Sequence, residues 1–191
     1  SRRRYAQYKT DPDLHAARAA TSWFVSFDDH EVDNNWAGDS DQDGTPAEVF
    51  LFRRATAMQA YYEHMPLRRR SLPNGSHMQI YRTARYGDLL NMFVLDTRQY
   101  RSDQVYGDKD GPQREAVWAS QRSMMGAEQE QWLFNGLARS DTRWNLLAHQ
   151  VMMLNLGHRK SANAQLEYSM DQWSGYLYSR KLPSGMEETI G

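Results

Sequence analysis

The sequence predicts a layered α/β fold, because stretches typical of strands alternate with stretches typical of helices along its 191 residues. Two of the apolar, strand-like stretches end directly in charged side chains, and in α/β sheets binding sites form beyond the strand ends. A chain of this length lies within the size range of one domain and can bury a core without disulfides. We therefore expect residues 1–191 to form a single domain with a site at its strand ends.

The first helix and the first strand follow from a capping signal and an apolar run. Asp11-Pro12 places an N-cap residue ahead of a proline at the first helical position, which predicts a short helix over residues 13–21. Residues 22–27 are apolar nearly throughout, which is typical of a strand that is covered on both faces.

The longest helix is predicted to open at Thr45-Pro46, where the cap-and-proline signal recurs, and to end near His64, just ahead of Pro66. Apolar residues recur there at the three-and-four spacing of one buried helix face. These residues are Ala47, Phe50, Leu51, Ala55, Met58 and Tyr62.

The second half of the chain continues the alternation and adds a predicted hairpin. The elements that we predict are a strand over 78–86, a turn at Gly87-Asp88, a strand over 89–95, a long loop over 99–126, a helix over 128–139 with Trp132, Leu133 and Leu137 inward, and a strand over 144–153. A loop of that length inside a compact domain is usually functional or mobile.

Composition excludes several classes of protein and of site. The 23 Lys plus Arg and 24 Asp plus Glu leave a formal net charge of -1, so no specific nucleic-acid binding and no attraction to anionic membranes is expected. The absence of cysteine excludes a disulfide framework, a thiolate metal site and a cysteine nucleophile. No apolar run approaches the roughly 20 residues that cross a bilayer, so we expect no membrane span.

A cluster of ionisable side chains follows the first strand in the stretch FVSFDDHEVDNNW. Its members are Asp28, Asp29, His30 and Glu31. Burying an unpaired charge costs roughly several kcal/mol, so these charged side chains need a partner of opposite charge or a metal ion. Carboxylate oxygens suit Ca, Mg, Mn or ferric iron, and an imidazole beside them can ligate a metal or act as a general acid. The alternative is a turn in which the charges pair with arginines; a second apolar strand that ends in Asp96 and Arg98 favours a site.

The stretch GDSDQDGTPAEV matches half of a calcium-binding loop. Asp39, Asp41 and Asp43 alternate ahead of a glycine, as in the first half of such loops, but the twelfth position is Phe50 in place of a bidentate glutamate. We favour a solvated acidic loop over a weak peripheral calcium site.

Two further residues admit two interpretations each. His149 interrupts an apolar strand, where a metal ligand and the commoner satisfied core residue both fit. Asp171, two residues before Trp173, fits a helix N-cap or a site carboxylate.

Five blocks, in the right order over nearly the whole chain, resemble the PhoD-like alkaline phosphatases. They read SFDDHEVDNNWAG, RRATAMQAYYEHMPLR, YRTARYGDLLNMFVLDTRQYRSDQ, EQEQWLFNGLARSDTRWNLLAHQVMM and DQWSGYLYSR. The resemblance implies a metallophosphatase-like αββα sandwich with mixed sheets. It also implies extracytoplasmic (secreted or periplasmic) hydrolysis of a small-molecule phosphomonoester or phosphodiester, and a cluster of ferric iron, Fe(3+), and calcium, Ca(2+).

The resemblance assigns roles to named residues. The implied metal ligands are Asp28, Asp29, Asn34 or Asn35, and Asp171. His30 is implied to protonate the leaving oxygen, and Glu31 is implied to orient His30. Arg98 either contacts phosphate or pairs with Asp96.

The chain also departs from the family pattern. Ser174 replaces the second aspartate of a D-x-W-D-G-Y block, and His149 stands where glutamine is expected. An upstream G-D-Y-I-Y-E block and a downstream G-D-V-H block, which carry further metal ligands, do not occur. We therefore expect the middle portion of a catalytic domain, with an incomplete metal cluster and exposed strand edges that favour a homodimer. The alternative function is a catalytically silent calcium-binding or interaction domain that retains the fold.

Overall fold

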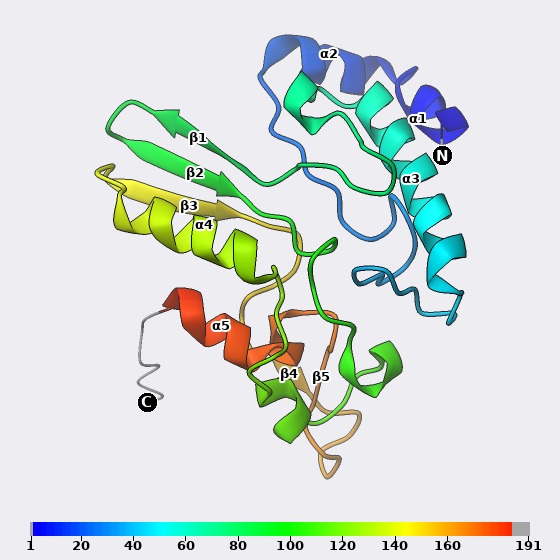
Figure 1. The fold of residues 1–191 in the computed structure, drawn as a ribbon, viewed down its shortest axis with the longest axis vertical. Coiled ribbons are helices and arrows are strands. Elements are labelled where there is room, and N and C mark those ends of the chain that lie inside the picture. Colours follow the sequence, from blue (N-terminus) through cyan, green and yellow to red (C-terminus); the bar gives the residue numbers. More distant parts are fainter. Residues whose placement is uncertain (1, 185–191) are drawn as a thin grey trace.

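A three-stranded mixed sheet lies at the centre of the structure, a computed structural model that describes residues 2–184 (Figure 1). Strand β1 (Arg82–Tyr86) pairs antiparallel with β2 (Leu90–Val94), and β2 pairs parallel with β3 (Trp144–Ala148). The β1–β2 hairpin confirms the prediction, although β1 begins four residues later than the predicted strand. β3 ends at Ala148, so the predicted strand over 144–153 is correct only in its first half.

Helix α4 (Ala127–Ala138) connects β2 to β3 and lies along one face of the sheet (Figure 1). Its Leu133 is fully buried in a cluster with Phe93 of β2, and Leu147 of β3 packs against the same cluster. Gly136 of the helix lies close to the Phe93 ring. A Cβ at position 136 would be 2.5 Å from a ring carbon, so a larger residue does not fit there. Trp132 and Leu137 pack against the same cluster, so the predicted helix and its three inward residues are confirmed.

Three helices form a second group beside the sheet: α1 (Arg2–Tyr8), α2 (Pro12–Ala20) and α3 (Ala47–His64) (Figure 1). The Asp11 carboxylate caps α2 as predicted, accepting the backbone N–H groups of Asp13 and Leu14. The buried face of α3 is rotated from the predicted one. Its buried residues are Phe50, Arg54, Ala57, Met58, Ala60 and Tyr61, because the Arg54 guanidinium is drawn inward to the carbonyl of Ser76 at 2.8 Å.

The predicted strand over residues 22–27 is wrong. The segment is irregular and has no ladder partner within the described part of the chain. Side chains hold it instead: Arg82 donates to the Val25 carbonyl at 2.7 Å, and Gln150 donates to the Ser26 hydroxyl at 2.5 Å. Only Phe27 of this run is buried, whereas Trp23 and Phe24 are 40% and 44% exposed. An apolar run alone does not specify a strand, because a strand needs a neighbouring backbone to pair with.

The remaining chain forms a smaller unit below the sheet in Figure 1. It contains the two-stranded sheet of β4 (Gly157–His158) and β5 (Glu167–Tyr168) and the helix α5 (Leu177–Ser184). Short 3-10 turns complete the fold: η1 (Arg69–Ser71), η2 (Val105–Asp108), η3 (Glu115–Trp118) and η4 (Trp173–Gly175). The predicted loop over 99–126 is irregular apart from η2 and η3. Within residues 2–184, no helix combines the length and the hydropathy needed to cross a bilayer.

Candidate functional site

The turn between Phe27 and Trp36 carries most of the predicted site residues. Both flanking aromatic rings are buried, with centroids 6.0 Å apart, and they pack in one cluster with Phe50 of α3. The Trp36 indole also donates to the carbonyl of Asp28 at 3.3 Å. The core therefore fixes both ends of the turn and leaves the residues between them at its surface.

Asp29 organises this turn through its backbone and its side chain. Its carbonyl accepts the backbone N–H groups of Val32 and Asp33, each at 2.9 Å. Its carboxylate accepts the backbone N–H of His30 on one oxygen at 2.8 Å and that of Asn35 on the other at 3.0 Å. A carboxylate oxygen has two acceptor positions, so each Asp29 oxygen keeps one free for another partner.

The His30 imidazole projects outward from the turn, with 78% of its side chain exposed. Its Nε2 lies 3.0 Å from the Asn34 side-chain oxygen and 3.6 Å from an Asp29 carboxylate oxygen. The hydrogen bond to Asn34 and the negative charge of Asp29 raise the pKa of His30. The imidazole is therefore protonated over a wider pH range than a free histidine.

Glu31 lies in the same turn but does not contact the imidazole of His30. Its carboxylate accepts the backbone N–H of Asp28 at 2.9 Å. The contacts that orient His30 come from Asn34 and Asp29, so Glu31 contributes to the shape of the turn.

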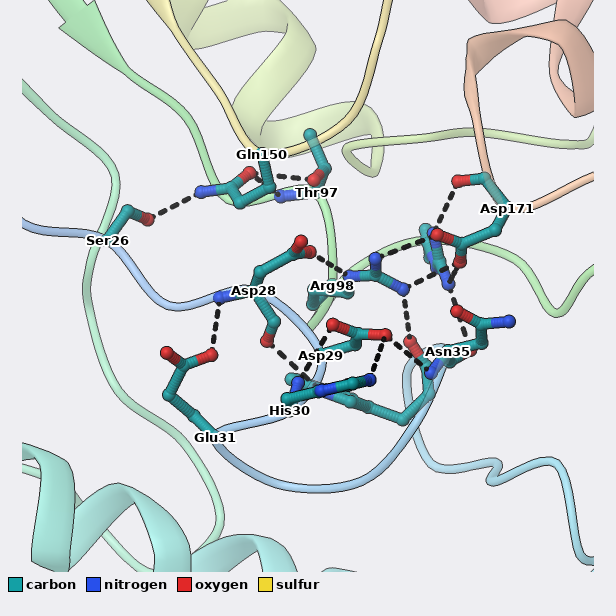
Figure 2. A network of polar contacts seen from close by, with 12 residues as sticks. Ser26, Asp28, Asp29, His30, Glu31, Asn35, Thr97, Arg98, Gln150 and Asp171 are labelled. Carbon is teal, nitrogen blue, oxygen red and sulfur yellow. Dashed lines mark hydrogen bonds and ion pairs between the residues drawn. The ribbon is translucent and has the colours of Figure 1, made fainter. Parts of the chain in front are cut away.

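Arg98 lies between Asp28 and Asp171 and joins them (Figure 2). Its Nε donates to Asp28 at 2.7 Å, and its two terminal nitrogens donate to Asp171 at 2.7 and 2.9 Å. Only 1% of the Arg98 side chain is exposed, whereas 42% of the Asp28 side chain is exposed. The guanidinium is therefore committed to two carboxylates, which is poor geometry for a direct contact with phosphate.

Arg101 and Gln104 complete the surroundings of Asp171. Arg101 donates to Asp171 at 2.5 Å, and Gln104 does so at 3.1 Å. Burial opposes ionisation, but the hydrogen bonds and charges of the two arginines lower the pKa of Asp171 to about 2. These two residues were not predicted as site residues. Arg101 follows the same apolar stretch as Asp96 and Arg98, which is a signal in the sequence, whereas no sequence pattern singles out Gln104.

Asp96 has a local role at the end of β2. Its carboxylate accepts the backbone N–H groups of Arg98 and Gln99, each at 3.0 Å, and the Gln99 side chain at 2.5 Å. Complete burial raises the pKa of Asp96. The alternative pairing of Arg98 with Asp96 therefore exists through the Arg98 backbone N–H, while the guanidinium binds Asp28 and Asp171, and Asp96 caps the turn that follows the strand.

Gln150 and His149 follow β3 at the same edge of the sheet. Gln150 joins three segments, because it accepts the Thr97 hydroxyl at 2.7 Å and donates to the Ser26 hydroxyl and the Leu95 carbonyl. His149 lines a cavity of about 300 Å³ together with Asp28 and Glu31. Burial lowers the pKa of His149, and its buried Nδ1 has no hydrogen-bond partner within the described residues.

The acidic loop after Trp36 is organised around Asp41. One oxygen of its carboxylate accepts the backbone N–H groups of Asp43 at 3.1 Å and Thr45 at 2.9 Å. The other oxygen lies 3.5 Å from the Arg53 guanidinium, and Asp39 and Asp43 are exposed. The Asp41 side chain is 0% exposed, so the loop is solvated at Asp39 and Asp43 only, and no three carboxylates of the loop, all of which lie within the described residues, could hold a calcium ion.

The described residues do not fit the implied iron and calcium cluster by themselves. Within residues 2–184, no group of three His, Asp or Glu side chains could hold a metal ion. Asp171 is enclosed by arginines, and Asp28 has one oxygen bound to Arg98. Asn34 uses its side-chain oxygen to contact His30, and Asn35 donates its side-chain nitrogen to Asp108. These residues alone therefore do not make a metal site.

Comparisons with known proteins agree on one family. A family model described as PhoD-like phosphatase matches residues 1–189. Alkaline phosphatase D of Bacillus subtilis strain 168 is 49% identical over 180 residues, which are 94% of this chain and 30% of that protein. A solved chain titled "Structure of PhoD" superposes with a TM-score of 0.88 at 47% identity, covering 94% of this chain and 34% of that one. The predicted mixed α/β fold class is thereby confirmed, and the chain spans about a third of the length of these relatives.

Proposed function

The chain belongs to the PhoD-like phosphatase family, and from this premise we propose that it is the part of a phosphoric ester hydrolase that carries the proton donor. The family match over residues 1–189 is the observation that carries the proposal. The substrate class is a small-molecule phosphomonoester or phosphodiester, and residues 1–191 act as one segment of the catalytic domain. The related B. subtilis protein is named an alkaline phosphatase.

His30 is the proposed general acid. Its imidazole is exposed, and its contacts with Asn34 and Asp29 favour the protonated form. In hydrolysis a water oxygen forms a new bond to phosphorus while the ester P–O bond breaks. The proton of His30 passes to the leaving oxygen, and the proton that water releases restores the imidazolium. Protonation matters most where the leaving alkoxide is a strong base.

Metal dependence is part of the proposal and rests on the family resemblance. Iron and calcium would supply Lewis-acid activation of the phosphoryl group. The oxygen atoms of this turn that remain open to coordination belong to Asp28, Asp29 and the Asn35 side chain. Carboxylate and amide oxygens suit hard cations, but these residues need further donors to complete a site. An extracytoplasmic location and a homodimer through sheet edges are further proposals.

The test uses the full-length protein and two substrates with different leaving groups. We expect His30→Ala to lower kcat by roughly 10²- to 10⁴-fold with an alkyl phosphate. The loss with p-nitrophenyl phosphate should be much smaller, because p-nitrophenolate leaves without protonation. His158→Ala is the matched control, since His158 is also exposed and lies beside an aspartate, Asp110, at 3.3 Å.

Two outcomes would contradict the proposal. No hydrolysis of either substrate by the wild type, with iron and calcium supplied, would favour the catalytically silent domain. Equal losses for the two substrates in His30→Ala would remove the proton-donor role from His30 while leaving the hydrolase intact.

A further inference from the structure

Arg98, Arg101 and Asp171 form a buried cluster that takes no part in the proposed chemistry. The two arginine side chains are 1% and 0% exposed, and the Asp171 side chain is 11% exposed. One Asp171 oxygen accepts Arg98, Arg101 and Gln104, and the other accepts Arg98. Charge-assisted, bidentate hydrogen bonds of this kind are stronger than hydrogen bonds between neutral groups.

This arrangement disagrees with the metal-ligand role that the family resemblance implies for Asp171. A cation that coordinated the oxygen shared by Arg98, Arg101 and Gln104 would have to displace two guanidinium groups, and a cation at the other oxygen would face the positive charge of the Arg98 guanidinium bound there. Removing one partner of a buried ion pair is strongly unfavourable, because the other charge remains buried without compensation. The carboxylate is therefore already neutralised from within the protein.

We propose that Asp171 is a positioning residue, which holds Asp28 and Asp29 in place through Arg98 and Arg101 and does not ligate a metal. The proposal rests on the proposed function only in naming what is positioned. The contacts of Asp171 with Arg98 and Arg101, and of Arg98 with Asp28, can be tested without any measurement of catalysis.

The first route from Asp171 to the turn passes through Arg98. The same guanidinium that binds Asp171 with two nitrogens binds Asp28 with the third (Figure 2). Because a guanidinium is planar and rigid, fixing two of its nitrogens fixes the direction of the third. The position of Asp28 is thereby set from a residue more than a hundred positions away in the sequence.

The second route passes through Arg101 and Asn35. The Arg101 nitrogen that binds Asp171 also donates to the Asn35 carbonyl at 3.0 Å, and Gln104 donates to the same carbonyl at 2.5 Å. The Asn35 backbone N–H then donates to the Asp29 carboxylate at 3.0 Å. The Asp29 carboxylate is thus oriented by a backbone group that the arginine holds.

The backbone of Asn35 supports this interpretation. Its φ of 49° lies in the left-handed region, and its side chain donates to Asp108, whose φ is 72°. Such conformations in non-glycine residues persist where the surroundings impose them, and they concentrate at functional sites. Here the carbonyl contacts of Asn35 impose the conformation that directs its N–H toward Asp29.

The test compares Asp171→Asn with Leu133→Ala in the full-length protein by hydrogen exchange. Leu133→Ala is the matched control, because it removes a buried side chain of α4 and destabilises the protein without touching the cluster. We expect exchange at the His30 and Asn35 backbone amides to rise at least about tenfold in Asp171→Asn, relative to the control at matched stability. Equal exchange at both amides in the two variants would overturn the positioning role.

Two further measurements separate this proposal from the hydrolase proposal. At saturating iron and calcium, the number of metal ions bound per chain, measured by elemental analysis, should be the same in Asp171→Asn as in the wild type, while the metal affinity falls by about 10- to 100-fold and kcat falls by about 10²-fold with KM nearly constant. A loss of one metal ion per chain in Asp171→Asn at saturating metal would overturn the proposal and restore the ligand role. Absence of hydrolysis in the wild type would refute the proposed function alone, since the exchange experiment would still decide the role of Asp171.

Discussion

Replacing Asp171 by asparagine should be among the most destabilising single changes at this site. The substitution keeps the shape of the side chain and removes its charge, so Arg98 and Arg101 remain buried without a carboxylate between them. Breaking a buried pair in this way typically costs about 3–5 kcal/mol.

The depressed pKa of Asp171 gives a second measure of the same effect. A shift from the ordinary 3.8 to about 2 corresponds to about 2 kcal/mol of stability from the charged form. Because the folded-state pKa is the lower one, this contribution is complete above about pH 5 and disappears as the pH falls toward about 2. We therefore expect Asp171→Asn to lose about 2–5 kcal/mol of unfolding free energy at neutral pH.

The assay is urea unfolding followed by circular dichroism at several pH values. The difference in unfolding free energy between the wild type and Asp171→Asn should narrow as the pH falls from about 5 toward about 2. Asp141→Asn is the matched control: Asp141 also pairs with an arginine, Arg85 at 2.6 Å, but it is exposed, so its replacement should change stability little. A neutral-pH loss in Asp171→Asn as small as the control's would refute the reasoning.

Three further predictions concern neighbouring contacts. Gln129→Leu should cost about 1–3 kcal/mol in urea unfolding, because the buried Gln129 side chain bonds both the N–H and the carbonyl of Asp96; a loss below the error of the measurement would contradict this. Asn35→Ala should destabilise the protein more than Asn35→Gly, by roughly 1 kcal/mol, because only glycine adopts a φ of 49° without strain; the reverse order would be incompatible with the left-handed backbone. Asn34→Ala should lower the pKa of His30 in an NMR titration, because Asn34 makes the largest contribution to its rise; an unchanged titration would show that the hydrogen bond is absent in solution.

Local signals in the sequence predicted the elements that local interactions stabilise. The Asp11 cap, the helix from Ala47 and the β1–β2 hairpin each depend on residues that are close in sequence. The strand over residues 22–27 failed for the opposite reason. Its apolar pattern is real, but strand formation depends on a backbone partner that no local pattern reveals.

The sequence placed three of the candidate residues in one cluster, but the predicted site did not include Arg101, Gln104 or the contacts that connect the cluster to Asp171. The cluster of Asp28, Asp29 and His30 was expected at the end of an apolar stretch, and these residues do share one turn. Their pairing with arginines was the competing interpretation, and it describes Asp28 correctly. The contact between Arg98 and Asp171 joins residues 73 positions apart, and such pairings depend on the completed fold.

The central claim is that Asp171 holds Asp28 and Asp29 in place through Arg98 and Arg101 and does not ligate a metal. Metal-to-oxygen distances in a crystal structure of the full-length protein, with iron and calcium located by anomalous diffraction, test this most directly. The account predicts an Asp171 carboxylate that is still bound by both arginines and that lies farther from every metal ion than the about 2.0–2.6 Å of a metal–oxygen bond. A metal ion coordinated by Asp171, with Arg98 and Arg101 turned away, would contradict it.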